Sequence, residues 1–187
     1  MNELENKISK ILGKKKVKNI INNELTHAAV LIPLYEKEKE YSIFFTKRLK
    51  TLKRHAGQIS FPGGIFEDSD KDLKMTAIRE TCEELGIKQN CIKVLGRLDD
   101  MATSTGYLIS PFVGVLNSYK ELKINREEID ELISIPLFDL MKTTPRAEIW
   151  TVKDSPYPVY YYDYGKWVIW GATAKILKNF LEITSEI

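Results

Sequence analysis

The sequence predicts an α/β protein in which a mixed β-sheet is sandwiched between α-helices. Apolar residues recur at helical spacing near both ends and once in the middle of the chain, and short strand-like apolar runs fill the segments between them. Strands flanked by helices imply layers packed around a common core. With 187 residues, 43% of them hydrophobic, we expect one domain over 1–187, including an N-terminal helical extension over 1–23.

Each element follows from its local pattern. Residues 2–21 predict a short packing helix, because their leucines and isoleucines recur at helical spacing. A charged turn at 36–40 predicts a hairpin between strands at 27–34 and 41–46. The remaining expected elements, in order, are a β segment at 59–61, a helix over about 72–85, strands near 92–97, 107–116 and 129–135, a short helix over 137–141, β segments at 151–152, 159–163 and 166–169, and a closing helix over 170–183.

Composition narrows the classes of function. The net charge of +2 does not call for a nucleic-acid partner, and we interpret the lysine run at 14–16 as a solvated edge. No apolar run approaches the roughly 20 residues of a membrane span, and the N-terminal residues lack the apolar core of a signal peptide, so we expect a cytoplasmic protein without a membrane partner. Cys82 and Cys91 lack metal-binding spacing. The oligomeric state stays open, with a homodimer as one alternative.

Three carboxylates are concentrated on the central predicted helix. At about 100° per residue, Glu80, Glu83 and Glu84 share one side, away from the apolar stripe of Met75, Ile78, Cys82 and Leu85. Like charges four residues apart cost roughly 0.2–0.5 kcal/mol unless a cation lies between them. Hard oxygen ligands select Mg²⁺ or Mn²⁺. The alternative is a solvated face of ion pairs, for example between Arg79 and Glu83.

The segment before this helix favours the cation site. Phe61-Pro62-Gly63-Gly64 ends an apolar run, and its glycines let the backbone approach a ligand closely. Ser69 or Asp70 is the expected helix N-cap. We therefore expect a cation site placed to receive a phosphate group.

At these residues the chain resembles the Nudix box. The residues that match are Arg79, Glu80, Glu83, Glu84, Gly86 and Ile87. Three features depart from the general pattern: Asp70 stands at the position of the first glutamate, Thr81 replaces an apolar residue, and the spacing from Gly64 to Arg79 is one residue longer. The longer spacing is typical of the coenzyme A pyrophosphatase branch of the family.

A second signature of that branch lies directly upstream, over residues 44–64. Thr46, Arg48, Gly57 and the Phe-Pro-Gly-Gly end match in register. Leu49 replaces a small residue, and Lys53, with Arg54 beside it, replaces the second arginine of the pattern. Lysine binds phosphate as a point charge and arginine as a two-pronged fork, so the match keeps the positive charge but not the fork. The segment 168–177 also resembles this branch.

The resemblance implies the Nudix fold and a metal-dependent hydrolase. Its site would hold Mg²⁺ or Mn²⁺ on Glu80, Glu83 and Glu84, with the Gly64 carbonyl as a further ligand and Arg79 as an orienting residue. A later glutamate, Glu128 or Glu131, would act as a ligand or general base. The alternative at both positions is a charged strand edge.

The same resemblance implies coenzyme A or one of its derivatives as the small-molecule substrate, cut at its diphosphate to 4′-phosphopantetheine and adenosine 3′,5′-bisphosphate. Arg48, Lys53 and Arg54 suit its 3′-phosphate, and Gly57, Gly63 and Gly64 belong to the substrate loops. Tyr107, Trp150 and Tyr160 are candidates to stack adenine or to pack within the protein. Two alternatives stay open: a Nudix hydrolase for ADP-ribose, a dinucleotide or a nucleoside triphosphate, and a non-catalytic nucleotide sensor, which the three glutamates disfavour.

Overall fold

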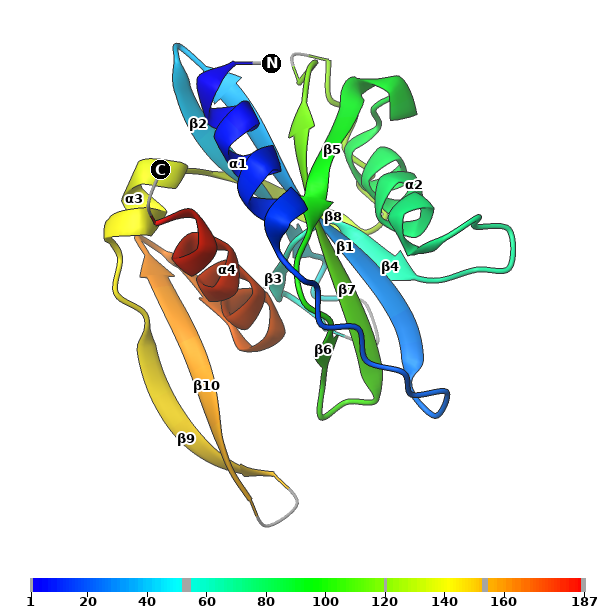
Figure 1. Ribbon diagram of the computed structural model, residues 1–187, viewed down its shortest axis with the longest axis vertical. Helices are drawn as coiled ribbons and strands as arrows, with labels where there is room; N and C mark the ends of the chain where they lie inside the picture. Colours follow the sequence, from blue (N-terminus) through cyan, green and yellow to red (C-terminus); the bar gives the residue numbers. More distant parts are fainter. Residues whose placement is uncertain (1, 52–54, 120, 153–154, 186–187) are drawn as a thin grey trace.

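The computed structural model describes residues 2–51, 55–119, 121–152 and 155–185. A mixed sheet lies between helices on its two faces, and a smaller sheet extends beside it (Figure 1). The α/β class and the mixed sheet between helices, both expected from the sequence, are confirmed. None of the described helices is long and apolar enough to cross a bilayer.

The larger sheet follows the order β3-β2-β1-β7-β5, with β4 beside β1, β6 beside β7 and β8 beside β2. Among the described strands of this sheet, β1 and β7 pair in parallel and all other pairs are antiparallel. Its strands are β1 (Thr26–Lys37), β2 (Glu40–Arg48), β3 (Ile59–Ser60), β4 (Gly63–Ile65), β5 (Ile92–Arg97), β6 (Met101–Ala102), β7 (Tyr107–Leu116) and β8 (Ile129–Pro136).

Helices cover both faces of this sheet because alternate strand residues are apolar on each side. On one face, α1 (Glu3–Lys14) and α4 (Gly171–Thr184) pack over a core that includes Phe45 and Phe180. On the other, α2 (Leu73–Leu85) packs over a second core that includes Phe44. Phe44 and Phe45 enter opposite cores, as the two-residue repeat of a strand requires. The sheet therefore separates α2 from α1 and α4 (Figure 1).

The smaller sheet has three antiparallel strands, β9 (Arg146–Val152), β10 (Ser155–Tyr164) and β11 (Trp167–Trp170). It follows the short helix α3 (Leu137–Lys142) and precedes α4. Figure 1 shows the β9–β10 hairpin reaching away from the larger sheet, and six of the seven residues of β9 are exposed. At its inner side, β11 lies against β3.

Most predicted elements are found, and the differences have local causes. The N-terminal helix ends at Lys14 instead of reaching residue 21, since the backbone of Lys18 bonds to the 99–100 loop, donating to the Asp99 side chain and accepting from the Asp100 amide. The predicted N-cap at Ser69 or Asp70 is wrong: Asp72 caps α2 by accepting from the Met75 amide at 2.8 Å. β4 and β6 were not predicted, and β9 is longer than the expected two residues because it pairs along β10.

Candidate functional site

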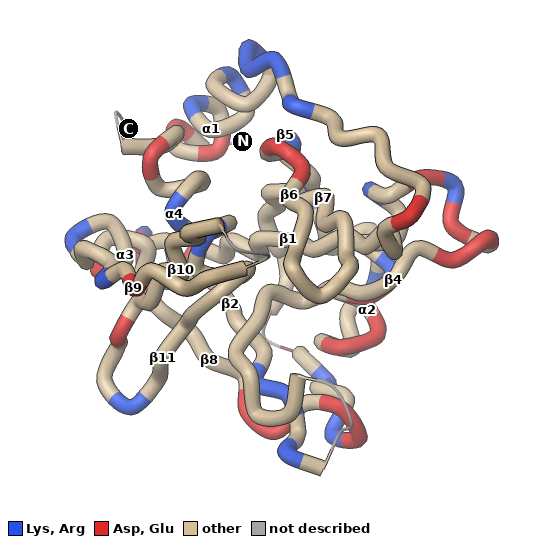
Figure 2. The backbone as a smooth tube through the Cα atoms, turned by 90° about the horizontal axis from the view of Figure 1, so that it is seen from below, with Lys and Arg blue, Asp and Glu red and all other residues tan. Residues whose placement is uncertain are grey.

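Helix α2 places the predicted carboxylates against β2 and β4 of the larger sheet. Asp72 begins the helix, and Gly86 ends it in the left-handed conformation, with φ of 65°. A β-carbon at Gly86 would lie 2.1 Å from the Lys123 carbonyl oxygen, so only glycine fits there. Acidic positions mark both α2 and the loop that joins it to β4 (Figure 2).

Asp70 and Arg79 form the centre of this region. Arg79 donates from Nε and Nη2 to the two carboxylate oxygens of Asp70, each at 3.0 Å. Asp70 is buried and also accepts from the Glu67 amide and the Thr76 hydroxyl. The hydrogen bond from Arg79, more than any other interaction, holds the pKa of Asp70 at about 2, below its ordinary value.

Arg79 also contacts two of the box glutamates. Its Nη1 donates to Glu80 at 2.9 Å and to Glu83 at 3.1 Å. Burial raises the pKa of Glu80, while the guanidinium of Arg79 opposes that rise. Arg79 therefore links the loop carboxylate Asp70 to the carboxylates of the helix.

Glu84 corrects the expectation that the acidic side of the helix faces away from the core. The residue is buried and only 3% exposed. Burial raises the pKa of Glu84 to about 8, against the opposing effects of the Thr46 hydroxyl, Arg48 and the Gly63 amide. Its Oε2 atom is buried without a hydrogen-bond partner among the described residues. A buried, unpartnered carboxylate oxygen is costly in a fold unless a ligand uses it.

The two glycines of β4 allow the sheet to approach α2 closely. A β-carbon at Gly64 would lie 2.2 Å from Oε1 of Glu80, and one at Gly63 would lie 2.3 Å from the Ala29 carbonyl oxygen. Pairing of β4 with β1 fixes this position, with Gly64 opposite Ala29. The Gly64 backbone and the Glu80 carboxylate are consequently neighbours.

The donors gathered here suit a hard divalent cation. The side chains of Glu80, Glu83 and Glu84 offer only oxygen atoms, and the unpartnered Oε2 of Glu84 is one that a cation could use. In the described residues, however, no three His, Cys, Asp or Glu side chains converge closely enough to hold one ion. The Nη1 atom of Arg79 bridges Glu80 and Glu83 by donating to both, so a cation that binds these two carboxylates requires the three side chains to rearrange.

Glu128 and Glu131, which the sequence left as alternatives, have different surroundings in the structure. Glu128 lies beside Arg48, with 3.8 Å between Oε2 and Nη1, and is close enough to Glu80 to raise the pKa of Glu80. Glu131 instead contacts Lys166 at 3.1 Å and accepts from the Trp167 indole at 3.3 Å. Glu128 is thus brought to the box and Glu131 is not.

Of the other predicted site residues, some lie near the carboxylates, some lie elsewhere and two are outside the described residues. Arg48 lies close enough to Glu84 to lower its pKa, whereas Lys53 and Arg54 fall outside the described residues. Gly57 lines a pocket of about 440 Å³ between β3 and β11. Of the aromatic candidates, Trp150 lies on the exposed β9, with its ring centroid 6.1 Å from that of Trp170.

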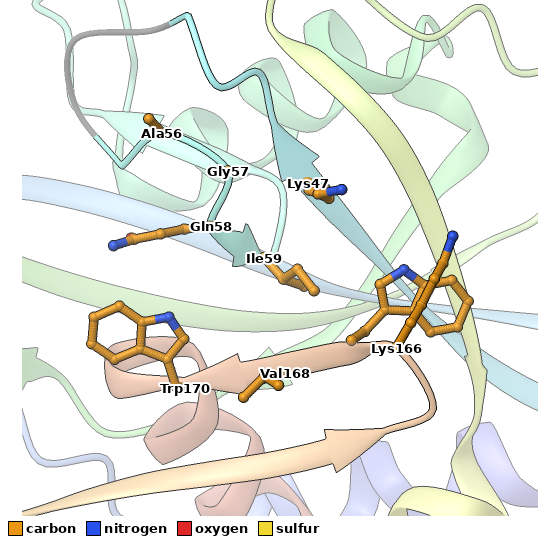
Figure 3. Close-up of a pocket in the computed structure, with 9 residues that line it drawn as sticks. Lys47, Ala56, Gly57, Gln58, Ile59, Lys166, Val168 and Trp170 are labelled. Atoms are coloured by element: carbon orange, nitrogen blue, oxygen red, sulfur yellow. The ribbon is translucent and has the colours of Figure 1, made fainter.

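That pocket is lined largely by side chains that sequence reasoning did not single out. Figure 3 shows Gln58 and Trp170 on opposite walls at one end, and Lys47 and Lys166 toward the other. Lys47 and Gln58 fall within the 44–64 signature and Trp170 within the 168–177 segment, but nothing in the sequence indicates that these two segments, with Lys166, surround one pocket. A second pocket, of about 600 Å³, is lined by residues of β1, β4 and the start of α2, including His27, Ile65 and Lys71.

The sequence and the fold of this chain are similar to those of known Nudix proteins. Residues 25–157 match the NUDIX domain. Nudix hydrolases called uncharacterized NudL are 37% identical over 157 residues in Photorhabdus laumondii, covering 83% of each chain, and 34% identical in Yersinia enterocolitica, covering 83% of this chain and 80% of that one. The fold is similar to that of a C. elegans Ap4A hydrolase, with a TM-score of 0.56 and 16% identity, covering 87% of this chain and 100% of the other. The chain belongs to the NUDIX domain family, and it is a Nudix hydrolase, an enzyme that acts on pyrophosphate bonds.

Proposed function

We propose that this Nudix hydrolase cleaves the diphosphate of coenzyme A or one of its derivatives into 4′-phosphopantetheine and adenosine 3′,5′-bisphosphate. The observation that carries the proposal is the position of the 44–64 segment. Its matching residues Thr46 and Arg48 lie beside the buried Glu84, and its last two glycines form β4 against Glu80. The segment that resembles the coenzyme A pyrophosphatase branch thus adjoins the carboxylates of the box.

Nudix hydrolases generally use divalent metal ions, and we assign Mg²⁺ or Mn²⁺ to this one. Glu80, Glu83 and Glu84, with the Gly64 carbonyl, would hold it. When bound, such a cation neutralises the diphosphate and lowers the pKa of the attacking water.

The remaining residues would orient and neutralise the substrate. Arg48 reaches the edge of the carboxylate cluster, where its fork can bind the diphosphate oxygens. Asp70 holds Arg79, which in turn positions Glu80 and Glu83. Glu128, beside Arg48 and near Glu80, is our candidate for the general base.

The alternatives differ in substrate or in turnover. ADP-ribose, a dinucleotide or a nucleoside triphosphate would use the same box with a different nucleotide contact, whereas a sensor would bind without cleavage. The three box glutamates of this chain favour an enzyme. We expect the protein to act on a small molecule in the cytoplasm, without a nucleic-acid or membrane partner, as a monomer or a homodimer.

The proposal is tested by incubating the purified protein with coenzyme A, dephospho-coenzyme A, ADP-ribose and a nucleoside triphosphate, each with Mg²⁺ or Mn²⁺. Products are identified by mass, beside a Glu84→Gln control. Metal-dependent release of adenosine 3′,5′-bisphosphate that the control lacks would support the coenzyme A assignment. Cleavage of another substrate alone would overturn that specificity, and binding without cleavage of any of them would favour the sensor.

A further inference from the structure

The pocket between β3 and β11 has two chemically different ends. Gln58 and Trp170 face one another across one end, and Lys47 and Lys166 lie toward the other (Figure 3). Its volume of about 440 Å³ is within the range of pockets that hold small molecules. An aromatic wall facing an amide suits a nucleobase, and paired ammonium groups suit a phosphate.

The indole of Trp170 is held in place before any ligand arrives. It stacks on Tyr161, with ring centroids 6.2 Å apart and planes inclined by 12°. Tyr161 in turn lies under the Arg146 guanidinium, 4.0 Å from its ring centroid. These three residues are opposite one another across β9, β10 and β11. A wall fixed by its own packing loses little side-chain freedom when a base contacts it.

The lysine end of the pocket carries carboxylates that a phosphate would replace. Glu131 lies 3.1 Å from the Lys166 ammonium and 3.6 Å from that of Lys47. Lys47 also contacts Asp130 at 3.2 Å. An anionic ligand would therefore exchange with Glu131, so loss of the Glu131 charge should strengthen binding of that ligand.

The pocket and the hydrolase site lie on opposite faces of the sheet near the end of β2, because Lys47 points away from the face on which Thr46 and Arg48 meet Glu84. Lys47 lies between Thr46 and Arg48 on β2, and it pairs with Ile59 of β3. Arg48 and Glu128 are close together at the box, whereas Lys47 and Glu131 line or border the pocket. A ligand that uses both sites, with its diphosphate at Arg48, has to pass around the β3 edge of the sheet to reach the pocket.

We infer that this pocket binds the nucleotide half of the substrate, with a purine base between Gln58 and Trp170 and a phosphate on the sugar between Lys47 and Lys166. The inference rests on the proposed function for the identity of the substrate. It moves the sugar phosphate from Arg48, Lys53 and Arg54, the residues that the sequence suggested for it, to Lys47 and Lys166. Gln58 and Trp170 then become determinants of base specificity.

Binding can be measured without turnover, by calorimetric titration of adenosine 3′,5′-bisphosphate, AMP and inorganic phosphate into metal-free protein. The bisphosphate should bind more tightly than AMP, and AMP more tightly than phosphate. Gln58→Ala should weaken both nucleotides, and Lys166→Ala should reduce the advantage of the bisphosphate over AMP by at least about threefold, the scale of one exposed ion pair. Glu131→Gln should tighten the bisphosphate by a similar factor, because it keeps the side-chain shape and removes the competing charge.

Lys71→Ala, in the second pocket, is the matched control and should leave all three affinities unchanged. Unchanged nucleotide affinities in Gln58→Ala and in a Lys47→Ala/Lys166→Ala double variant would overturn the inference, as would phosphate binding as tightly as the nucleotides. The mass assay with coenzyme A separates the two proposals. If the pocket variants lose nucleotide binding but the wild-type protein does not cleave coenzyme A, the proposed substrate is wrong and the pocket assignment stands. If the wild-type protein cleaves coenzyme A but the pocket variants bind nucleotides as it does, the pocket assignment is wrong and the substrate stands.

Discussion

Asp70 binds Arg79 through both carboxylate oxygens, at 3.0 Å from Nε and from Nη2. Asp70 lies in the loop before α2 and is buried, so this pair ties the loop to the helix. Arg79 extends the link to Glu80 and Glu83. The geometry of the box carboxylates thus depends on a residue that lies outside the helix.

Replacing Asp70 by Asn should destabilise the fold by about 2 kcal/mol, since a buried charged hydrogen-bond partner of Arg79 and Thr76 is lost. Urea unfolding measures the change. Asp68→Asn, an exposed change two residues away, is the control and should fall within about 0.5 kcal/mol of wild type. Equal stabilities of the two variants would show that the pair contributes little.

Asp70 should also impose a pH dependence on stability. Its pKa of about 2 in the folded protein is below the ordinary 3.8, so folding favours the charged form. That stabilisation is fully present above pH 4 and is lost as the pH falls from about 4 toward 2. The difference in unfolding free energy between wild type and Asp70→Asn should therefore shrink over this interval. A difference that stays constant between pH 5 and pH 2.5 would contradict this origin.

The sequence predicted the helix and its acidic side, but it placed Glu84 wrongly. A helical wheel describes one helix alone, whereas the surroundings of Glu84 come from β2 and β4, which supply Thr46 and Gly63. Glu128 and Glu131 could not be told apart for the same reason, because only strand pairing decides which side of the sheet each one meets. The pocket residues on β2 and β11 have no shared sequence spacing, so only the tertiary structure brings them together.

Adding Mg²⁺ should raise the unfolding temperature of the wild-type protein, because a ligand that binds only the folded state stabilises it, by about 2.7 kcal/mol at a hundred times its dissociation constant. Glu80→Gln and Glu84→Gln should each reduce this increase, and a chelator should abolish it. Thermal unfolding followed by circular dichroism gives the result. Glu131→Gln, on a carboxylate that faces Lys166, should respond as wild type does. An undiminished response in both box variants would place the cation elsewhere.

Glu128 and Glu131 should differ in their effects on turnover. Glu128 lies beside Arg48 and near Glu80, so Glu128→Gln should lower kcat, by about a hundredfold if it is the general base. Glu131→Gln should change kcat by no more than about threefold, the size of its expected effect on nucleotide binding, since Glu131 contacts Lys47 and Lys166 instead. Steady-state kinetics on the substrate identified by mass distinguishes them. A larger loss of kcat in Glu131→Gln would reverse the assignment.

Replacing Gly64 by Ala should mainly lower activity, whereas replacing Gly63 by Ala should mainly lower stability. At Gly64 the new β-carbon would meet the end of the Glu80 side chain, 2.2 Å from Oε1, and that side chain can rotate away. Stability should therefore change little, while displacement of Glu80 by about 1 Å or more should lower kcat by roughly a hundredfold. At Gly63 the β-carbon would meet the Ala29 backbone oxygen at 2.3 Å, which cannot move without distorting β1, so Gly63→Ala should lower the unfolding temperature. Gly13→Ala, with open space around its β-carbon, is the control and should keep full activity. If Gly64→Ala retained wild-type kcat, Glu80 would not need its present position against β4.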